Sequence, residues 1–414
     1  MKIFFKNILI VFMGCALIST KTWAEGRPKG LKKTPNIAIN ISGKKKTPQK
    51  TYLNLGLLSN FSQLNGLGIN VISSITHWNT TGFQVSGFAN VTGMNAKGFQ
   101  FSGIANVTGR NTYGMSISGL MNINGNDSYG MLLSGIGNIS GNSAKGFIIG
   151  GLMNMSGKSS NGIFLSGLAN ISGNEQRGIM LSGLANVSGS SLKGLQISSL
   201  LNVAGEKNCG LQLAALGNVS VTNKGMQLAL LNYAAENNGL QTGLANVNTE
   251  KGLGVQLGVV NVSKNEKARQ IGLFNIKPYT RTQLILSGGN TGKFNISARF
   301  KNKYTYSQVG FSAYNLGFDQ KFSAAGFYRL GVYRAICPRL ELSADMGYYH
   351  IETFKNNDYG YEARMYALQP KINLEYRITE KLGIFASGGY NWTLMYGHSG
   401  NFHKVSFEAG IVLF

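Results

Sequence analysis

The sequence predicts an all-β protein, with a β-solenoid of about 16-residue coils followed by a small antiparallel β-barrel of about eight strands. The first observation is a repeat, because Gly recurs every 16 residues from Gly82 to Gly210 and Asn every 16 residues from Asn90 to Asn218. The second is a change near residue 283, after which apolar and polar residues alternate in long, aromatic-rich runs. The third is composition, because 56 Gly and only 6 Pro favour many tight corners over a disordered linker.

The first 24 residues carry the pattern of a secretory signal peptide. Lys2 and Lys6 precede an apolar run over residues 8–18, and a small-residue cleavage site ends at Ala24. The apolar run is too short for a membrane-spanning helix, which needs about 20 residues. Cys15 offers an alternative, a lipoprotein box, but apolar residues continue past it, so cleavage after Ala24 is favoured. The sequence therefore predicts export.

Residues 25–50 form a basic leader in a chain whose formal net charge is +23. A solvated linker is the preferred interpretation, with contact to anionic lipid or glycan as the alternative. Nucleic acid is not an expected partner, because the leader lacks interleaved aromatic residues and the chain is exported. The cations of the leader are Arg27, Lys29, Lys32, Lys33, Lys44, Lys45, Lys46 and Lys50.

Residues 51–81 are expected to cap the solenoid and residues 82–276 to form its coils. Positions in each coil are counted from the leading Gly, which is offset 0. Apolar residues fall at offsets 1, 3, 6 and 9, and Gly or Ser-Gly steps fall between them. These spacings do not fit a helix but do fit short strands separated by corners. We expect stacked coils about 4.8 Å apart, with the apolar offsets forming a continuous core.

The recurring Asn at offset 8 predicts a ladder in which each side-chain amide bonds to the same residue of the next coil. A ladder explains why the spacing never slips over nine copies. Its predicted members are Asn90, Asn106, Asn122, Asn138, Asn154, Asn170, Asn186, Asn202 and Asn218.

An alternative treats offsets 1–11 as one strand of about 10 residues, the length of a membrane-barrel strand. The whole chain would then be one large transmembrane β-barrel that acts as a channel or transporter. Barrel turns differ in length on the two sides of a membrane, whereas these repeats are identical and lack aromatic girdles. The solenoid is therefore preferred.

No catalytic residue or cofactor is predicted. Calcium-binding solenoids need regular Asp, and the strict repeats contain only Asp127. Acyltransferase solenoids need a His, and none lies between His77 and His350. Several ladder positions are also Asn-x-Ser/Thr sequons, which we attribute to the repeat because glycosylation requires exposure. Cys209 and Cys337 are expected to be unpaired or buried thiols.

The repeat units resemble those of a known family. Runs such as GFQVSGFANVTG (82–93) and GVQLGVVNVS (254–263) are similar to the surface-repeat-containing protein family of Gram-negative bacteria, and the similarity covers residues 51–276. The resemblance implies a surface or outer-membrane location and no reaction. Many units here have Ser, Leu or Met where the family often has Gln.

Residues 283–414 are expected to form an outer-membrane-type barrel. Alternation is clear in LELSADMGYY (340–349) and KINLEYRI (371–378), and tight turns alternate with longer polar loops, as in outer-membrane barrels. The predicted strands are 283–290, 292–300, 303–314, 320–335, 339–354, 361–378, 381–396 and 403–414.

Charged residues on the polar face of these strands are expected to neutralise one another inside the barrel, because eight strands leave an interior just filled by side chains. A catalytic carboxylate pair among them is disfavoured. His398 and His403 lack a third ligand, so no metal site is predicted. The predicted interior charges are Arg299, Arg329, Glu341, Asp345, Glu375, Arg377 and Glu408.

These patterns predict a non-enzymatic envelope protein whose partners are outer-membrane lipid and a glycan or protein ligand. An even strand count puts both barrel ends on the short-turn, periplasmic side. A solenoid entering the first strand directly would then be periplasmic, in conflict with the family's surface label, unless the strand count is off by one.

Overall fold

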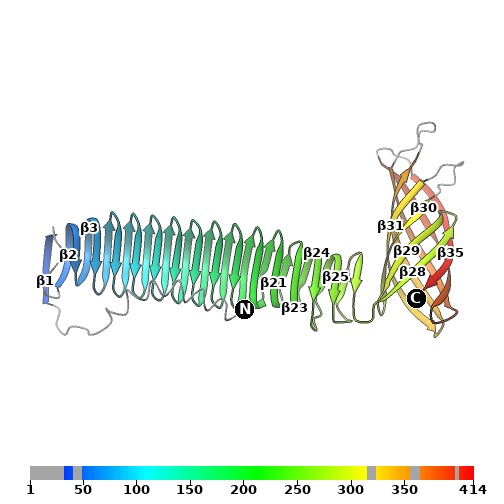
Figure 1. The fold of residues 1–414 in the computed structure, drawn as a ribbon, viewed down its shortest axis with the longest axis horizontal. Coiled ribbons are helices and arrows are strands. Elements are labelled where there is room, and N and C mark those ends of the chain that lie inside the picture. The colour runs from blue at the N-terminus through cyan, green and yellow to red at the C-terminus, as the bar shows by residue number, and fades with distance from the viewer. Residues whose placement is uncertain (1–31, 41–48, 315–322, 355–363, 397–400) are drawn as a thin grey trace. The chain divides into compact units, whose positions relative to one another are not determined.

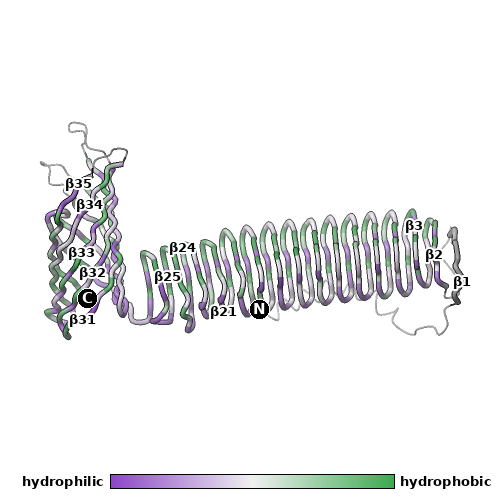
Figure 2. Tube along the Cα trace, turned by 180° about the vertical axis from the view of Figure 1, so that it is seen from behind, coloured by the Kyte–Doolittle hydropathy of each residue, from purple (hydrophilic) through white to green (hydrophobic). Residues whose placement is uncertain are grey.

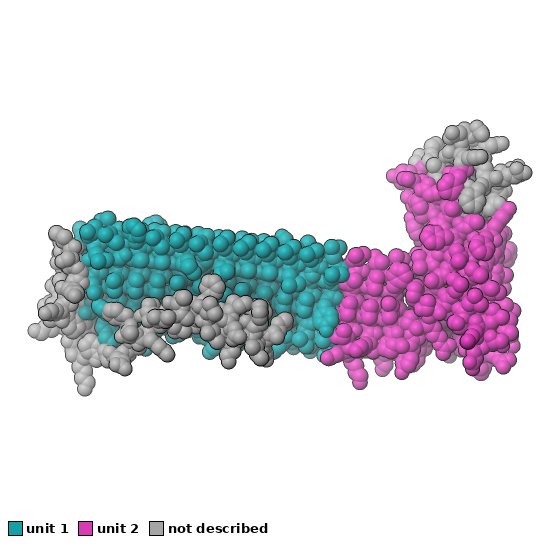
Figure 3. All heavy atoms as spheres, viewed as in Figure 1, with its two compact units in different colours: residues 1–241 teal, residues 242–414 magenta. Residues whose placement is uncertain are grey.

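The computed structural model describes residues 32–40, 49–314, 323–354, 364–396 and 401–414. The predicted signal peptide and most of the predicted basic leader lie outside these ranges. The chain is 77% strand and divides into two units, Met1–Gln241 and Thr242–Phe414 (Figure 3). None of the described segments is a helix with the length and apolar character needed to cross a bilayer.

The predicted fold class is confirmed, because the structure contains a parallel β-solenoid of about 14 coils and a closed eight-stranded antiparallel barrel (Figure 1). Each strict 16-residue coil contributes two strands, such as β4 (Thr80–Ser86) and β5 (Ala89–Thr92). The next coil repeats them as β6 (Ala96–Ser102) and β7 (Ala105–Thr108). Strand β4 pairs with β6, and β5 with β7, so stacking produces two parallel sheets.

The alternative of one large barrel is wrong, because the repeats pair in parallel with the residue 16 positions away. Gly82 pairs with Gly98, and Asn90 pairs with Asn106. Successive strands of a membrane barrel run antiparallel instead. The remaining strict-repeat strands are β8 (Thr112–Ser118), β9 (Met121–Asn124), β10 (Ser128–Ser134), β11 (Gly137–Ser140), β12 (Ser143–Gly150), β13 (Met153–Ser156), β14 (Ser159–Ser166), β15 (Ala169–Ser172), β16 (Gln176–Ser182), β17 (Ala185–Ser188), β18 (Ser191–Ser198), β19 (Leu201–Asn208), β20 (Leu211–Ala214) and β21 (Gly217–Asn223).

The coils at the two ends of the solenoid are less regular. Strand β1 (Lys32–Asn40) lies within the predicted basic leader and pairs in parallel with β2 (Gln49–Phe61), so that part of the leader continues the sheet. The other end strands are β3 (Gln63–Thr76), β22 (Met226–Leu228), β23 (Leu231–Asn237), β24 (Leu240–Asn248), β25 (Val255–Ser263), β26 (Arg269–Ile271) and β27 (Phe274–Ile276).

The leading glycines are required by the stacking of the coils. Gly146 has a φ of +130°, a region that residues with a Cβ rarely adopt. A Cβ on it would lie 2.0 Å from the carbonyl oxygen of Gly130 in the preceding coil. Gly recurs every 16 residues because each coil has one position where its backbone closely approaches that of the preceding coil.

The prediction that offsets 1, 3, 6 and 9 form an apolar core is wrong. Gln84, Ser86, Asn90 and Thr92 at offsets 2, 4, 8 and 10 are buried instead, whereas Phe83 at offset 1 is 57% exposed. Successive residues of a strand point to opposite faces, so a buried Asn at offset 8 forces offsets 7 and 9 outward. The solenoid interior is therefore largely polar and much of its outer surface is apolar.

The middle coils are an exception inside this polar interior. At offset 2, where other coils carry Gln or Ser, four successive coils carry Leu132, Ile148, Phe164 and Met180, each at most 2% exposed. With Ala144 they form one hydrophobic cluster. The interior thus has an apolar segment in the middle of unit 1.

The barrel closes through the pairing of its first and last strands, as eight strands were predicted to do. The turns at 302–304, 338–339 and 378–381 are short, as predicted, whereas the predicted longer loops lie almost entirely outside the described residues. Its strands are β28 (Arg281–Gly289), β29 (Gly292–Lys301), β30 (Thr305–Tyr314), β31 (Ser323–Cys337), β32 (Leu340–Thr353), β33 (Arg364–Arg377), β34 (Leu382–Met395) and β35 (Asn401–Leu413).

Candidate functional site

The Asn residues at offset 8 form an unbroken hydrogen-bonded series in unit 1. The Nδ2 of Asn154 donates to the Oδ1 of Asn170 at 2.9 Å and to the carbonyl of Leu165 at 2.7 Å. Its own Oδ1 accepts from Asn138 at 2.8 Å. The same side-chain bond, 2.8–3.1 Å long, links Asn90, Asn106, Asn122, Asn138, Asn154, Asn170, Asn186, Asn202, Asn218 and Asn232.

This series consumes the hydrogen-bonding capacity of the Asn side chains. Each amide that donates to both its neighbour and a backbone carbonyl has no free proton, and the predicted ladder residues are at most 2% exposed. The ladder also continues beyond the strict repeats, since Asn246 donates to Asn261, and Asn261 to Asn275, both at 2.9 Å. The Asn-x-Ser/Thr sequons therefore lie where no glycan could be attached.

A second ladder of glutamines runs through the interior at offset 2. Gln100 donates to Gln84 at 3.0 Å, and Gln212 donates to Gln196 at 3.0 Å. Sequence reasoning missed this series, although Gln recurs at a fixed offset at both ends of the strict repeats. It is interrupted at Ser116 and by the apolar cluster of the middle coils.

The residues at offset 6 form an exposed apolar row, which we call the apolar edge. Each is 37–54% exposed, and equivalent residues lie about 4.8 Å apart. Figure 2 shows hydrophobic residues along one edge of the stacked coils and hydrophilic residues along the opposite edge. The apolar edge comprises Phe88, Ile104, Leu120, Ile136, Leu152, Leu168, Leu184, Leu200 and Leu216.

The opposite, polar edge is formed by offsets 11–14, and offset 15 lies near the start of the strand that leads from this edge to the apolar edge. Tyr113 stacks on Tyr129 with ring centroids 5.1 Å apart, and the ammonium of Lys97 lies 5.6 Å from the ring centre of Tyr113. Glu175 contacts Lys193 at 2.7 Å and Arg177 at 3.1 Å. The hydrogen bonds from Lys193 and Arg177 hold the pKa of the Glu175 carboxyl below its usual value.

All seven predicted interior charges lie inside the barrel or at its short-turn mouth. Arg299 contacts Glu375 at 2.5 Å, and Arg377 lies 3.5 Å from Glu341. Arg329 contacts Asp345, and its Nη1 donates to the hydroxyl of Tyr349 at 2.8 Å. These contacts join residues far apart in the sequence.

Two interior cations were absent from the predicted set. Lys371 contacts Glu408, and Lys301 contacts Glu341. Both share the alternation face of a predicted member, since Lys301 lies two residues after Arg299 and Lys371 four before Glu375. With them the interior holds five cations and four carboxylates, so its charge is nearly balanced.

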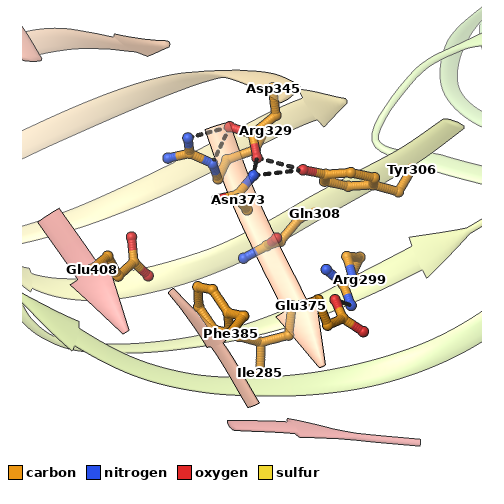
Figure 4. A pocket seen from close by; sticks show the side chains of 10 residues that line it. All are labelled: Ile285, Arg299, Tyr306, Gln308, Arg329, Asp345, Asn373, Glu375, Phe385 and Glu408. Carbon is orange, nitrogen blue, oxygen red and sulfur yellow. Dashed lines mark hydrogen bonds and ion pairs between the residues drawn. The ribbon is translucent and has the colours of Figure 1, made fainter. Parts of the chain in front are cut away.

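The space left between these charges is small. The cavity among them has a volume of about 20 Å³, room for about one water molecule (Figure 4). Its lining residues include Arg299, Tyr306, Arg329, Asp345 and Glu408. The other end of the interior is closed by an apolar cluster in which Phe327 stacks on Tyr349. The barrel interior is therefore a packed core.

A larger cavity of about 680 Å³ opens at the short-turn end of the barrel. Arg281, Lys303 and Arg334 line it, and within the described residues none of the three has a carboxylate partner within 4.0 Å. Tyr304 and Tyr333 supply aromatic walls. The arrangement suits a phosphate or carboxylate group.

The described part of the chain contains no disulfide and no cluster of residues placed to bind a metal ion. Cys209 and Cys337 are unpaired, as predicted, but both are exposed. The described residues contain no group of three or more His, Cys, Asp or Glu side chains placed to hold a metal ion. Of His398 and His403, His398 lies outside the described residues.

Comparison of the chain with protein-family models, with curated proteins and with solved structures gave no match.

Proposed function

We propose that this chain is a non-enzymatic protein of the Gram-negative outer membrane, anchored by its barrel. In this proposal the solenoid is a structural or adhesin-like surface that binds a glycan or protein ligand. The observation that carries the proposal is the polarity of the barrel, which is charged and packed inside and apolar outside.

Each of the eight barrel strands carries at least one large, exposed apolar side chain on its outward face. Phe311, Ile372 and Phe407 are 73%, 62% and 60% exposed on three different strands. Such exposure of large apolar side chains is costly in water and is typical of a surface that contacts lipid. Tyr390 and Trp392, whose rings meet edge to face at 5.6 Å, suit an interfacial girdle. Together these features support a membrane anchor.

The strand count supports an orientation for this anchor. Because eight strands return the chain to its starting side, the short-turn end would face the periplasm and the longer connections the exterior. Residues entering β28 would then start in the periplasm. Arg281, Lys303 and Arg334 at the short-turn mouth would lie near lipid phosphates.

The competing function, transport through a pore, assumed one large barrel made of all the repeats, and the repeats form a solenoid instead. A filled interior with a cavity of about 20 Å³ favours an anchor over a channel. We therefore expect the purified chain to give no stable conductance steps in a planar bilayer. Regular single-channel steps would contradict the anchor role.

Two measurements test the proposal. A folded outer-membrane barrel should resist SDS without heating and migrate faster than the boiled chain, and it should fractionate with the outer membrane. An epitope at Lys158–Ser159 on the polar edge should be cleaved by protease only after the outer membrane is permeabilised. Cleavage in intact cells would place the solenoid outside, and loss of heat-modifiable migration would refute the anchor.

A further inference from the structure

We infer that the apolar edge of the solenoid docks on the surface of an anionic phospholipid bilayer. The inference deepens the proposed function and rests on it, since it assumes that the barrel brings the chain to a membrane. Its basis is the juxtaposition, on one outer sheet face, of a long apolar row with a row of cations and tyrosines.

The shape of the apolar edge favours a flat, fluid partner. Its nine residues repeat in register, so at about 4.8 Å per coil the row is about 40 Å long. It is a ridge, and the sheets beside it offer no open strand edge along their length because each inner coil pairs with both neighbours. A peptide that binds by strand addition or in a groove therefore finds neither feature here.

The charges on the same face match anionic lipid. Lys97, Lys145, Arg177 and Lys193 all occupy offset 15, the residue just before the leading Gly, and all are exposed. On the outer face of each coil, the cation at offset 15 is followed along the strand by the outward residues at offsets 1 and 3, and then by the apolar edge at offset 6. This order of cation, then apolar strand, then apolar edge is the order of groups met from lipid headgroup to acyl chain.

The charge balance also argues against a second copy as the partner. Over residues 82–241 there are eight Lys or Arg residues and four Asp or Glu residues, a net charge of +4. Two copies that met through the same face would bring two cationic rows together, which costs free energy. An anionic bilayer instead attracts the cations of the offset-15 row.

Within unit 2, the final coil packs on the barrel. The hydroxyl of Ser307 donates to the carbonyl of Leu273 at 2.9 Å, and that of Tyr328 donates to the carbonyl of Gly272 at 2.5 Å. Phe274 meets Phe300 edge to face at 5.1 Å. Ser307, Tyr328 and Phe300 alternate with interior residues, so they lie on the outward wall, the one proposed to face lipid. The last coil is therefore held against the outward wall of the barrel.

The test uses the full chain with Cys209 and Cys337 replaced by Ser, so that one introduced thiol carries an environment-sensitive fluorophore. The probe position is Leu168→Cys on the apolar edge, and the matched control is Lys158→Cys on the polar edge. The chains are reconstituted into phosphatidylcholine vesicles with about 30% phosphatidylglycerol, with and without acyl-chain spin labels as quenchers. We expect a blue-shifted, strongly quenched signal at position 168 and little quenching at position 158.

A charge variant tests the role of the cationic row. Replacing Lys97, Lys145 and Lys193 together by Gln should lower the ratio of docked to free solenoid about a hundredfold, at about fivefold per cation. The same loss should follow when phosphatidylglycerol is omitted or salt is raised. Equal quenching in neutral vesicles would refute the electrostatic part of the inference.

Other outcomes separate the possible failures. Absence of quenching at position 168, with the barrel still heat-modifiable, overturns lipid docking and leaves the anchor standing. Energy transfer between differently labelled chains without quenching shows that a second copy covers the edge. Loss of heat-modifiable migration in the unsubstituted chain instead refutes the anchor. Leu120→Cys serves as a second probe if the Leu168 variant loses its protease resistance.

Discussion

Replacing Asn154 by Ala tests whether the ladder stabilises the solenoid. Asn154 lies in the middle of unit 1, is 1% exposed, and bonds to Asn138, Asn170 and the carbonyl of Leu165. Truncation leaves an amide proton of Asn138 and the Oδ1 of Asn170 without these partners in a site closed to water. At about 1–3 kcal/mol for each orphaned group, the coil should lose about 2–6 kcal/mol.

The loss should be local, because each coil of a solenoid contacts only its neighbours. Hydrogen–deuterium exchange read by mass spectrometry on peptides covering residues 153–171 measures it directly. Since 1.4 kcal/mol is a factor of ten, exchange there should accelerate by about 30-fold or more. The barrel peptides should exchange at unchanged rates.

A matched control removes an exposed amide from the same stretch of chain. The Asn174 side chain is exposed on the polar edge, so Asn174→Ala should change stability by no more than about 0.5 kcal/mol. If Asn154→Ala behaves like this control, the buried hydrogen bonds do not hold the coils together, and the stability must come from the backbone sheets and glycine corners alone.

Three further perturbations address the corner, the polar edge and the barrel. Gly146→Ala puts a Cβ against a backbone carbonyl at a positive φ, so the chain should become protease-sensitive within unit 1, and full resistance would contradict the close approach. The pKa of the Glu175 carboxyl, measured by NMR, should lie below 4.5. The ionised carboxylate should therefore stabilise the fold fully above pH 4.5, and this contribution should be lost as the pH falls through the folded-state pKa. Lys193→Gln should raise the pKa of Glu175, because it removes a hydrogen bond to the carboxylate. Arg329→Met should destabilise the barrel by about 3–5 kcal/mol in urea unfolding by leaving Asp345 unpaired, and adding Asp345→Leu should recover most of the loss.

The sequence determines the strand pattern well because short-range rules govern it. Close approach of the coils demands Gly at one position per turn, so the 16-residue spacing reveals the coil length directly. In the barrel, alternation separates the outward Leu342 from the inward Glu341, and the polar turns mark where the strands end. Predicted and observed barrel strands accordingly agree to within about three residues, apart from the connections outside the described residues.

For the solenoid strands, two predictions about which residues face inward contradict each other. An Asn ladder at offset 8 and an apolar core that includes offset 9 cannot coexist, because adjacent residues of a strand point to opposite faces. Applying that rule to Asn90 and Val91 would have identified the polar interior from the sequence. The rule that apolar residues lie inside a protein holds for a fold surrounded by water. The solenoid of this chain does not follow that rule, because its interior is largely polar.

The pairing partners inside the barrel could not be predicted. Arg299 and Glu375 are 76 residues apart, and their contact at 2.5 Å depends on strand tilt and on closure of β28 against β35. Alternation gives the face of each charge but not its height along the barrel axis. Sequence alone therefore predicts a balanced interior but not which charges neutralise which.

The polar interior and the apolar exterior of the solenoid follow from a single arrangement. A ladder of amides satisfies its own hydrogen bonds from coil to coil, so Asn and Gln can be buried without water. The apolar residues between them are then turned outward in every coil, and the exposed area grows with each repeat added. In water this growth is a liability that each further coil would worsen. Against a bilayer each coil adds contact, which gives a physical reason for a chain to carry this repeat so many times without a slip.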